Sequence, residues 1–356
     1  MTGIPFSPTS GDTPGSRRDP RRALQLALAS LWLLDAALQY QPVMFTKAFG
    51  STLADAAMGN PGVIANPINW TASLFEHHPV VLNGICATIQ LLLAVGLTWR
   101  PTVRLALGAS IVWSFAIWWL GEGLGGMLSQ MSSPINGAPG AVILYALLAV
   151  LLWPSTREDR AVFPAARCIG ARTARVTWFV LWATLASSAL WPGNRTPWTM
   201  AETIRDAASG EPGWLAAVVA AAARVVSWHG IKLSLLLAAV LLLIAVSVYL
   251  PKPAWRAGLV LAATLSAVIW VAGEALGGIF TGSGTDPNTG PLLILLVVAF
   301  WPGSGADQVP ADAVKSVIQP HLRELSVSSR NRFAAKVIDA DGRGCARRRG
   351  GGVFGG

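Results

Sequence analysis

Long apolar segments alternate with short polar connections along most of the chain. Eight segments consist almost wholly of apolar residues, and glycine, proline or charged residues bound them. They cover residues 23–42, 79–98, 102–121, 138–154, 174–192, 231–250, 254–273 and 289–302. A helix needs about 20 apolar residues to cross a hydrocarbon core of roughly 30 Å. The pattern therefore predicts eight membrane-spanning helices, and the fourth and eighth need their flanking residues to reach across.

The composition agrees with a lipid environment. Of the 356 residues, 53% are hydrophobic and only 13% are charged, and the mean hydropathy is +0.51. Since a soluble domain is about 25% charged, this chain cannot cover its apolar surface with polar groups. The sequence predicts an all-α integral membrane protein whose first partner is the lipid bilayer.

Basic residues gather in every second connection. The basic segments lie before residue 23, at 99–104, 155–175 and 251–256, and after residue 303. Positively charged connections stay on the cytoplasmic side, so both termini are predicted to be cytoplasmic. The net charge of +9 then reflects topology, and we expect no nucleic-acid binding. The abundance of Ala, Arg and Gly indicates a bacterial inner membrane.

The polar ends and the long outer connections complete the predicted organisation. Residues 1–22 and 303–356 have the composition of disordered cytoplasmic tails, the second one basic. The outer connections at 43–78 and 193–230 contain apolar stretches too short to span. Trp214–Trp228 is expected to be a helix lying in the outer interface. Three widely separated cysteines predict neither a disulfide framework nor a cysteine metal site.

Two parts of the chain share landmarks at a nearly constant spacing. The landmarks are DAAMGNPG at 55–62 and DAASGEPG at 206–213, GEGLGG at 121–126 and GEALGG at 273–278, and Trp-Pro at 153–154 and 301–302. The offsets are 151, 152 and 148 residues, so four residues are missing near the end of the second part. The sequence predicts two four-helix repeats, 23–154 and 174–302. Because four spans is an even number, these are parallel repeats and not inverted ones.

Glu122 and Glu274 are the first candidate site residues. Each follows a Trp-containing apolar helix and precedes Gly-rich chain, at the outer end of the third helix of its repeat. A carboxylate at the membrane boundary can simply contact water. Alternatively, the glycines allow close backbone approach and the carboxylate faces the bundle, where it binds a ligand or a proton.

Further duplicated polar positions accompany the glutamates. His78 and His229 lie 151 residues apart, before the second helix of each repeat, and Asn136 and Asn288 lie 152 apart. A histidine and a carboxylate can exchange protons, but the sequence favours a plain interfacial histidine without such a partner. One histidine and one glutamate are too few ligands for a typical zinc site, so no metal site is predicted.

Asp35 lies inside the first apolar segment, where a charge is costly and indicates function. Its counterparts in the second repeat, Leu185 or Ala186, are apolar. Either the first repeat alone keeps a functional site, or Asp35 pairs within the helix bundle.

Each repeat resembles the DoxX family of four-helix bacterial membrane proteins. The resemblance rests on LASLWLLDAALQYQP at 28–42, on LLLAVGLTWRP at 91–101, and on GEGLGG, which is similar to a segment of the DoxD-like members. It implies links to quinone and sulfur redox chemistry, including a thiosulfate:quinone oxidoreductase subunit. No outer cysteine and no haem, flavin or iron–sulfur motif carries such chemistry in this sequence.

Three functions remain open, and with them whether the protein is an enzyme. The first is a binding or accessory protein with outer-leaflet pockets for a lipid-like or quinone-like ligand, or a member of a larger membrane complex. The second is a quinone-linked oxidoreductase subunit in which Glu122 and Glu274 relay protons. The third is a small-solute transporter coupled through Asp35. No cofactor motif is evident. The resemblance to the DoxX family implies quinone as the cofactor to consider.

Overall fold

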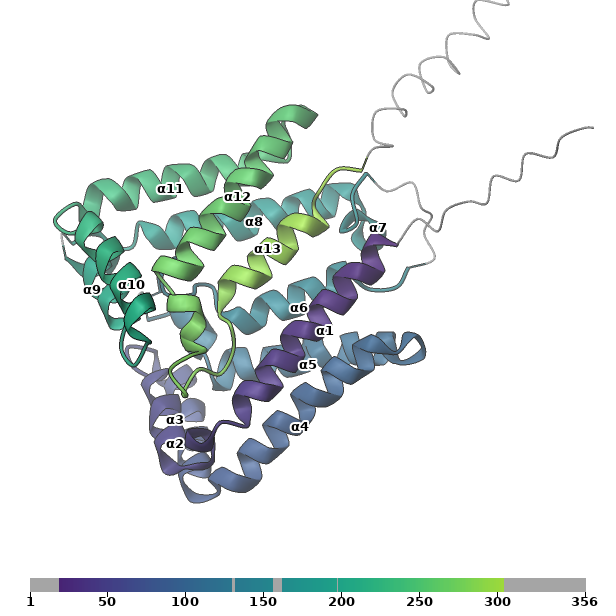
Figure 1. Cartoon of the computed structure of the whole chain (residues 1–356). Helices are drawn as coiled ribbons and strands as arrows, with labels where there is room; N and C mark the ends of the chain where they lie inside the picture. Colours follow the sequence, from purple (N-terminus) through teal and green to yellow (C-terminus); the bar gives the residue numbers. More distant parts are fainter. Residues whose placement is uncertain (1–18, 130–131, 156–161, 197, 304–356) are drawn as a thin grey trace, which may run out of the picture. The chain divides into compact units, whose positions relative to one another are not determined.

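The computed structural model describes residues 19–129, 132–155, 162–196 and 198–303, and the regular elements in these ranges are all helical. The expected tails lie outside the described residues, except that the first helix already begins at Pro20. The fold class is therefore all-α (Figure 1).

Two stretches of chain contain the same order of elements. The first comprises α1 (Pro20–Gln39), η1 (Pro42–Phe45), α2 (Lys47–Asp55), α3 (Gly62–His77), α4 (Pro79–Thr98), η2 (Arg100–Thr102), α5 (Val103–Leu120), η3 (Gly123–Gly126) and α6 (Ala141–Leu151). After α7 (Ala166–Ile169), the second comprises α8 (Ala171–Ala189), η4 (Pro192–Arg195), α9 (Thr199–Asp206), α10 (Gly213–Val226), α11 (Gly230–Ser247), α12 (Lys252–Ala272), η5 (Ala275–Gly278) and α13 (Thr289–Ala299). Only η2 and α7 lack a counterpart among these elements.

The helix contacts also correspond. In the first stretch α1 packs on α4, α4 on α5, and α5 on α6. In the second, α8 packs on α11, α11 on α12, and α12 on α13. Since α6 also contacts α13, and α1 contacts α13, the two stretches meet through their last helices.

Local sequence explains where the helices begin and end. Proline occupies one of the first two positions of α1, α4 and α12, where its missing N–H costs nothing. Asp19 caps α1, because its carboxylate accepts a hydrogen bond from the backbone N–H of Arg21 at 3.1 Å. At the opposite end, α5 and α12 stop at Gly121 and Gly273, at the start of the two Gly-rich segments.

Among the described residues, four helical segments are long and apolar enough to cross a membrane. They are Pro79–Thr98, Arg100–Leu120, Gly230–Ser247 and Lys252–Ala272. The other four predicted spans are also helices, but α6 and α13 have only 11 residues each. At a rise of 1.5 Å per residue they extend roughly 17 Å, about half of a hydrocarbon core. They are instead buried along most of their length.

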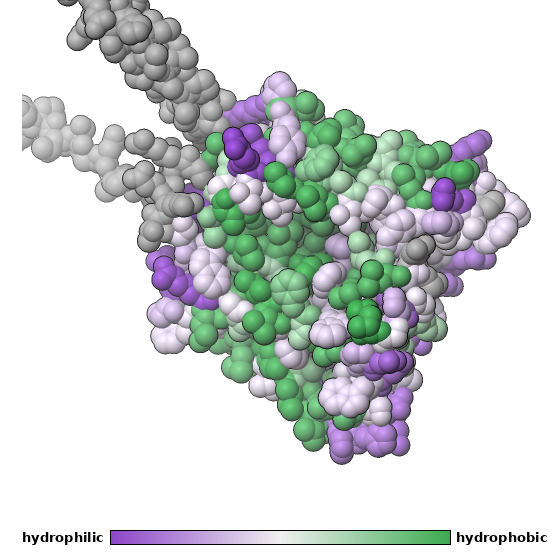
Figure 2. Space-filling view, turned by 180° about the vertical axis from the view of Figure 1, so that it is seen from behind, coloured by the Kyte–Doolittle hydropathy of each residue, from purple (hydrophilic) through white to green (hydrophobic). Residues whose placement is uncertain are grey.

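Many exposed side chains on the long helices are large and apolar, and their contact with water would be unfavourable. Leu92 on α4 is 63% exposed, Leu105 and Val112 on α5 are 75% and 72% exposed, and Leu235 on α11 is 55% exposed. Figure 2 shows apolar residues gathered over the middle of one face, with hydrophilic residues toward its edges. An extended apolar surface of this kind fits contact with lipid.

The core runs continuously through both stretches. Trp32 on α1 and Tyr145 on α6 are fully buried, with ring centroids 4.2 Å apart. Phe163, in the connection before α7, stacks on Phe300 at 5.1 Å. The adjacent Ala165 N–H donates to the carbonyl of Ala299 at 2.9 Å. The described part of the chain up to Pro302 therefore forms one compact unit.

The two long connections that the sequence predicts on the outer side are helical. In the first, α2 packs on α3, and in the second, α9 packs on α10; Figure 1 shows both pairs at the same end of the long helices. The expected helix Trp214–Trp228 corresponds to α10, and these two tryptophans are 60% and 81% exposed. Their location in a membrane interface stays a prediction.

Candidate functional site

Glu122 and Glu274 bind to the start of the helix that follows each of them. The Glu122 Oε1 atom accepts a hydrogen bond from the backbone N–H of Val142 at 3.2 Å, in the first turn of α6. The Glu274 Oε2 atom accepts one from Gly290 at 3.3 Å, in the first turn of α13. The first N–H groups of a helix have no partner within the helix and attract anions. Both carboxylates thus act as helix caps supplied from a distant part of the chain.

The Gly-rich segments allow this geometry. Gly125 and Gly277 have φ angles of +62° and +77°, and a Cβ atom on either would collide with backbone atoms of Pro139 or Pro287. Glycine is the residue that accepts both a positive φ and such close approach. The two Gly-rich segments therefore lie against the backbone of the connection that leads to the next helix.

The two carboxylates differ at one neighbouring position. In the second stretch the Thr289 hydroxyl donates to Glu274, whose side chain is almost completely buried. The corresponding residue in the first stretch is Ala141, which has no hydroxyl. The Glu122 Oε2 atom is buried and has no hydrogen-bond partner among the described residues. One acceptor is therefore satisfied within the protein and the other is not.

The same geometry corrects the pairing of Asn136 with Asn288. The indoles of Trp118 and Trp270 donate to Pro139 and Pro287, which makes the two prolines equivalent at an offset of 148 residues. Asn288 then corresponds to Gly140 and not to Asn136. Accordingly, the Asn136 Oδ1 atom accepts from the backbone of Ser133 at 2.7 Å, whereas Asn288 caps α13 through the Thr289 N–H.

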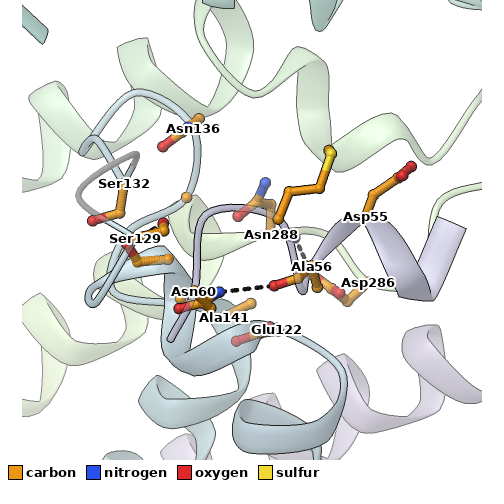
Figure 3. A pocket seen from close by; sticks show the side chains of 15 residues that line it. Asp55, Ala56, Asn60, Glu122, Ser129, Ser132, Asn136, Ala141, Asp286 and Asn288 are labelled. Carbon is orange, nitrogen blue, oxygen red and sulfur yellow. Dashed lines mark hydrogen bonds between the residues drawn. The ribbon is translucent and has the colours of Figure 1, made fainter. Parts of the chain in front are cut away.

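A pocket of about 370 Å³ lies beside Glu122, and we call it the Glu122 pocket. Its lining residues are Asp55, Ala56, Met58, Asn60, Glu122, Gly125, Gly126, Ser129, Ser132, Asn136, Gly137, Gly140, Ala141, Asp286 and Asn288. Figure 3 shows that the side chains come from the α2–α3 connection, from the segment between η3 and α6, and from the η5–α13 connection. The pocket is therefore built by both stretches of the chain, and eight of its fifteen lining residues have polar side chains.

The charged residues that line the Glu122 pocket are all acidic, namely Asp55, Glu122 and Asp286. Burial, and secondly the neighbouring Asp286, raises the pKa of Glu122 to about 8, against the backbone N–H groups of α6. Burial also raises the pKa of Asp286, although the Thr285 hydroxyl and the Asn288 N–H act in the opposite direction. Desolvation thus outweighs hydrogen bonding, and a charged Glu122 requires a counter-charge.

Asn60 provides a second acceptor without a partner. Its Nδ2 atom donates to the Ala56 carbonyl at 2.9 Å, which fixes the orientation of the amide (Figure 3). The Oδ1 atom is buried and unpartnered. Because an amide oxygen accepts but never donates, the pocket offers two acceptor oxygens, one from Asn60 and one from Glu122.

Asp35 lies deeper, within α1, and is 1% exposed. It is in electrostatic range of Asp286, of the Tyr145 hydroxyl and of Glu122. The Asp35 carboxyl and the Tyr145 hydroxyl are buried and interact with each other, although their separation does not meet the geometry of a regular hydrogen bond. Asp35 thus interacts with Tyr145 of α6 inside the bundle and also lies in electrostatic range of Asp286 and Glu122, so both alternatives for Asp35 stay open.

The structure does not bring the candidate histidines to the carboxylates. His78 and His229 immediately precede α4 and α11, which are equivalent positions, and both side chains are exposed. The His229 Nδ1 atom is 2.7 Å from the Ser227 carbonyl oxygen. Neither histidine lines the Glu122 pocket. Within the described residues, no group of three or more His, Cys, Asp or Glu side chains has the geometry to hold a metal ion.

Sequence reasoning missed Asp286, Asn60 and the role of Thr289. A signal for Asp286 was present, because Glu274 and Asp286 are the only charged residues between Arg256 and Pro302. Asn60 lies within the duplicated DAAMGNPG segment, where the second copy has Glu211. No sequence pattern marks Thr289, since its role depends on a hydrogen bond to Glu274, which lies 15 residues before it in the chain.

Comparisons of the chain with protein-family models, with curated proteins and with solved structures found no match. The resemblance to the DoxX family therefore stays a prediction from the sequence.

Proposed function

We propose that this chain is a multi-pass bacterial inner-membrane protein that binds a small polar ligand, or the polar head of a lipid, in the Glu122 pocket. The observation that carries the proposal is the pocket itself, with two buried acceptor oxygens that lack partners. Buried polar atoms in folded proteins are nearly always hydrogen-bonded. A bound molecule would supply the missing donors.

The architecture that we propose has eight spans in two parallel four-helix repeats, with both termini in the cytoplasm. The shared order of elements, the corresponding helix contacts and the alternation of basic connections support it. In this arrangement α6 and α13 cross the membrane together with their buried flanking loops. Non-helical backbone is tolerated at membrane depth where protein surrounds it. The Glu122 pocket then opens toward the outer side.

Single cysteines test this orientation. After Cys86, Cys168 and Cys345 are replaced by alanine, Met58→Cys and Tyr249→Cys place a thiol at opposite ends of the long helices. Both native side chains are more than half exposed. A membrane-impermeant maleimide added to intact cells should label the first thiol and leave the second unlabelled until the cells are opened. The reverse pattern would place the pocket on the cytoplasmic side.

The size and lining of the pocket favour a head group or small solute over a quinone. Its volume is at the lower end of the 300–1,000 Å³ typical of small-molecule sites. No aromatic side chain lines it. The Trp118 indole N–H already donates to the Pro139 carbonyl, and Trp119 is 44% exposed, so neither ring lines the pocket. The pocket therefore supports binding of a small polar ligand better than a role as a quinone-linked oxidoreductase subunit. A role in a larger membrane complex would not account for the pocket.

Blocking the pocket tests ligand binding directly. Ser129 lines it, and its hydroxyl donates to the Gly126 carbonyl, as that of the matched Thr281 does to Gly278. Native mass spectrometry of protein extracted with its lipids should show a retained small molecule or lipid in the wild type and in Thr281→Trp. Ser129→Trp should lose it. Retention of the same molecule in folded Ser129→Trp would place the ligand elsewhere.

A second candidate function is proton-coupled transport of a small solute. It is favoured by Asp35 and Tyr145, which extend a series of buried ionisable groups from the Glu122 pocket into the helix bundle. Such groups inside a membrane mark proton and ion pathways. Uptake into vesicles driven by a proton gradient should then disappear in Asp35→Asn. Uptake that survives this substitution would remove Asp35 from the mechanism.

A further inference from the structure

The Glu122 pocket has the chemistry to recognise a protonated amine. Three carboxylates line it, and Lys, Arg and His are absent from its lining. Of the two unpartnered atoms, Asn60 Oδ1 can only accept, and Glu122 Oε2 accepts once the carboxyl is ionised. A ligand that donates hydrogen bonds and brings positive charge satisfies both atoms and stabilises the ionised carboxylate. An ammonium group with its three N–H donors does both.

The second stretch shows how the protein itself satisfies the same carboxylate. There the Thr289 hydroxyl is the donor to Glu274, and the carboxylate is closed off from solvent. In the first stretch Ala141 occupies that position and lines the pocket, and Gly140 leaves the Glu122 Oε2 atom room that a Cβ would fill. The donor is thus missing beside the Glu122 pocket, which could receive one from outside.

Asp286 adds charge from the other half of the molecule. It follows η5, yet it lines the pocket beside Glu122. Its carboxylate is held in place by the Asn288 N–H at 2.7 Å and the Thr285 hydroxyl at 2.8 Å. A fixed second carboxylate makes the site more favourable for a cation, and the absence of a three-ligand metal geometry among the described residues argues against a divalent metal ion.

We propose that the Glu122 pocket binds a primary ammonium group, which donates hydrogen bonds to the free oxygens of Glu122 and Asn60. This inference rests on the proposed function, because it names the ligand class of the same pocket. An ammonium group occurs both on free organic amines and on the ethanolamine head group of membrane lipids. An oxidised quinone, by contrast, presents only acceptors to the two acceptor oxygens.

The binding experiment uses two probe pairs that differ in N–H donors. Ethanolamine and choline are the soluble pair, and phosphatidylethanolamine and phosphatidylcholine are the lipid pair; choline compounds carry a quaternary ammonium without N–H. Full-length protein in phosphatidylcholine nanodiscs is titrated with each soluble probe, and lipid retention is measured by native mass spectrometry. We expect the primary amine to bind at least 10-fold more tightly than its choline counterpart. Equal binding of the two would overturn the proposal.

The two probe pairs also separate the sources of the amine. If ethanolamine binds in solution, the pocket takes a free amine. If only phosphatidylethanolamine is retained, the lipid head group is the ligand. Either outcome supports the ammonium group as the recognised chemistry. A ligand that is displaced by Ser129→Trp but contains no N–H cation would leave the proposed function standing and sink this inference.

Substitutions at matched positions identify the carboxylate. Glu122→Gln should weaken amine binding at least 10-fold, while Glu274→Gln, its counterpart outside the pocket, should leave it within 2-fold. Ala141→Thr provides an independent variant, because it places an internal donor beside Glu122 as in the second half. It too should weaken binding, and its threonine is already compatible with a helix start of this geometry in α13. Unchanged amine binding in both folded variants would refute the assignment.

Binding should also depend on pH. The pKa of Glu122 is about 8 without ligand, and an alkylamine like that of lysine has a pKa near 10.4. Below pH 8 the ligand must displace a proton from Glu122, so affinity should fall up to about 10-fold per pH unit as the pH decreases. The ionisable groups facing Glu122 are Asp55, Asp286, Asp35 and Tyr145. Glu122→Gln should remove this dependence, and a pH-independent wild type would contradict it.

Discussion

The indole Nε1–H of Trp270 donates a hydrogen bond to the carbonyl oxygen of Pro287 at 2.8 Å. Trp118 makes the same bond to Pro139 at the same distance. In each case the tryptophan lies four residues before the glutamate, on the last turn of a long helix, and the proline lies in the connection to the next helix. The bond therefore fixes the loop that presents the helix start to the carboxylate.

Replacing Trp270 by Phe should destabilise the protein by about 1–3 kcal/mol. The substitution leaves the Pro287 carbonyl without its donor and removes part of a partly buried ring. Trp119→Phe is the control, because that ring is 44% exposed and should change stability by no more than about 0.5 kcal/mol. Thermal unfolding in nanodiscs measures both, and equal unfolding temperatures would show that the bond contributes nothing.

Gly125→Ala should be more damaging than an ordinary glycine substitution. Its φ of +62° is strained for alanine, and the added Cβ would collide with the Pro139 backbone. We expect a loss of at least about 2 kcal/mol, since backbone cannot move aside as a side chain can. Gly84→Ala in α4 meets nothing within 4 Å and should be neutral or stabilising by up to about 1 kcal/mol. A similar effect of the two substitutions on thermal unfolding would contradict the geometry.

Thr289→Ala should destabilise the protein, whereas Thr289→Ser should not. Loss of the hydroxyl leaves a buried oxygen of Glu274 unpartnered, which costs about 1–3 kcal/mol. Serine keeps the donor and loses only a methyl group, so it separates the hydrogen bond from packing. Unfolding curves of the three proteins at one pH make the comparison. If serine and alanine were equally destabilising, packing and not the hydrogen bond would be the cause.

The helices were predictable because their signals are local. The segment predicted at 79–98 coincides with α4, and 254–273 differs from α12 by only two residues at its start and one at its end. Each helix is marked by a run of consecutive apolar residues and, in these two cases, by a proline at its start. By contrast, 138–154 and 289–302 were too long for α6 and α13, since hydrophobicity does not distinguish a buried helix from the apolar chain beside it.

The pocket was predictable only in part. Glu122 was identified from its odd place among glycines, but Asp286 enters the pocket through the packing of α6 against α13, which no local pattern encodes. Asn136 and Asn288 share an offset of 152, yet the chain contracts by four residues before the second asparagine. Hydrogen bonds to Pro139 and Pro287 were needed to locate that contraction. Both histidines are exposed, which agrees with the favoured interpretation of a histidine without a carboxylate partner.

The stability of the protein should decrease as the pH rises from about 4.5 to about 8. Burial raises the pKa of Glu274 to about 8, although its hydrogen bonds with Thr289 and Gly290 oppose the shift. The folded state therefore holds a proton that the unfolded chain, with a glutamate pKa near 4.3, releases. The stabilisation is complete below the unfolded pKa and is lost as the pH passes through the folded pKa, by up to about 1.4 kcal/mol per pH unit for one group. Unfolding temperatures recorded across this range measure the slope.

Glu274→Gln should flatten this pH dependence. The amide can accept from the Gly290 N–H and donate to the Thr289 hydroxyl, so the neutral side chain keeps both hydrogen bonds of the glutamate. The variant should match the wild type near pH 4.5 and exceed its unfolding temperature near pH 8. Because Glu122 contributes a similar shift, the slope should be smaller still in the double variant with Glu122→Gln, while Asp286, whose pKa is also raised by burial, keeps part of it. A double variant as sensitive to pH as the wild type would mean that other groups carry the dependence.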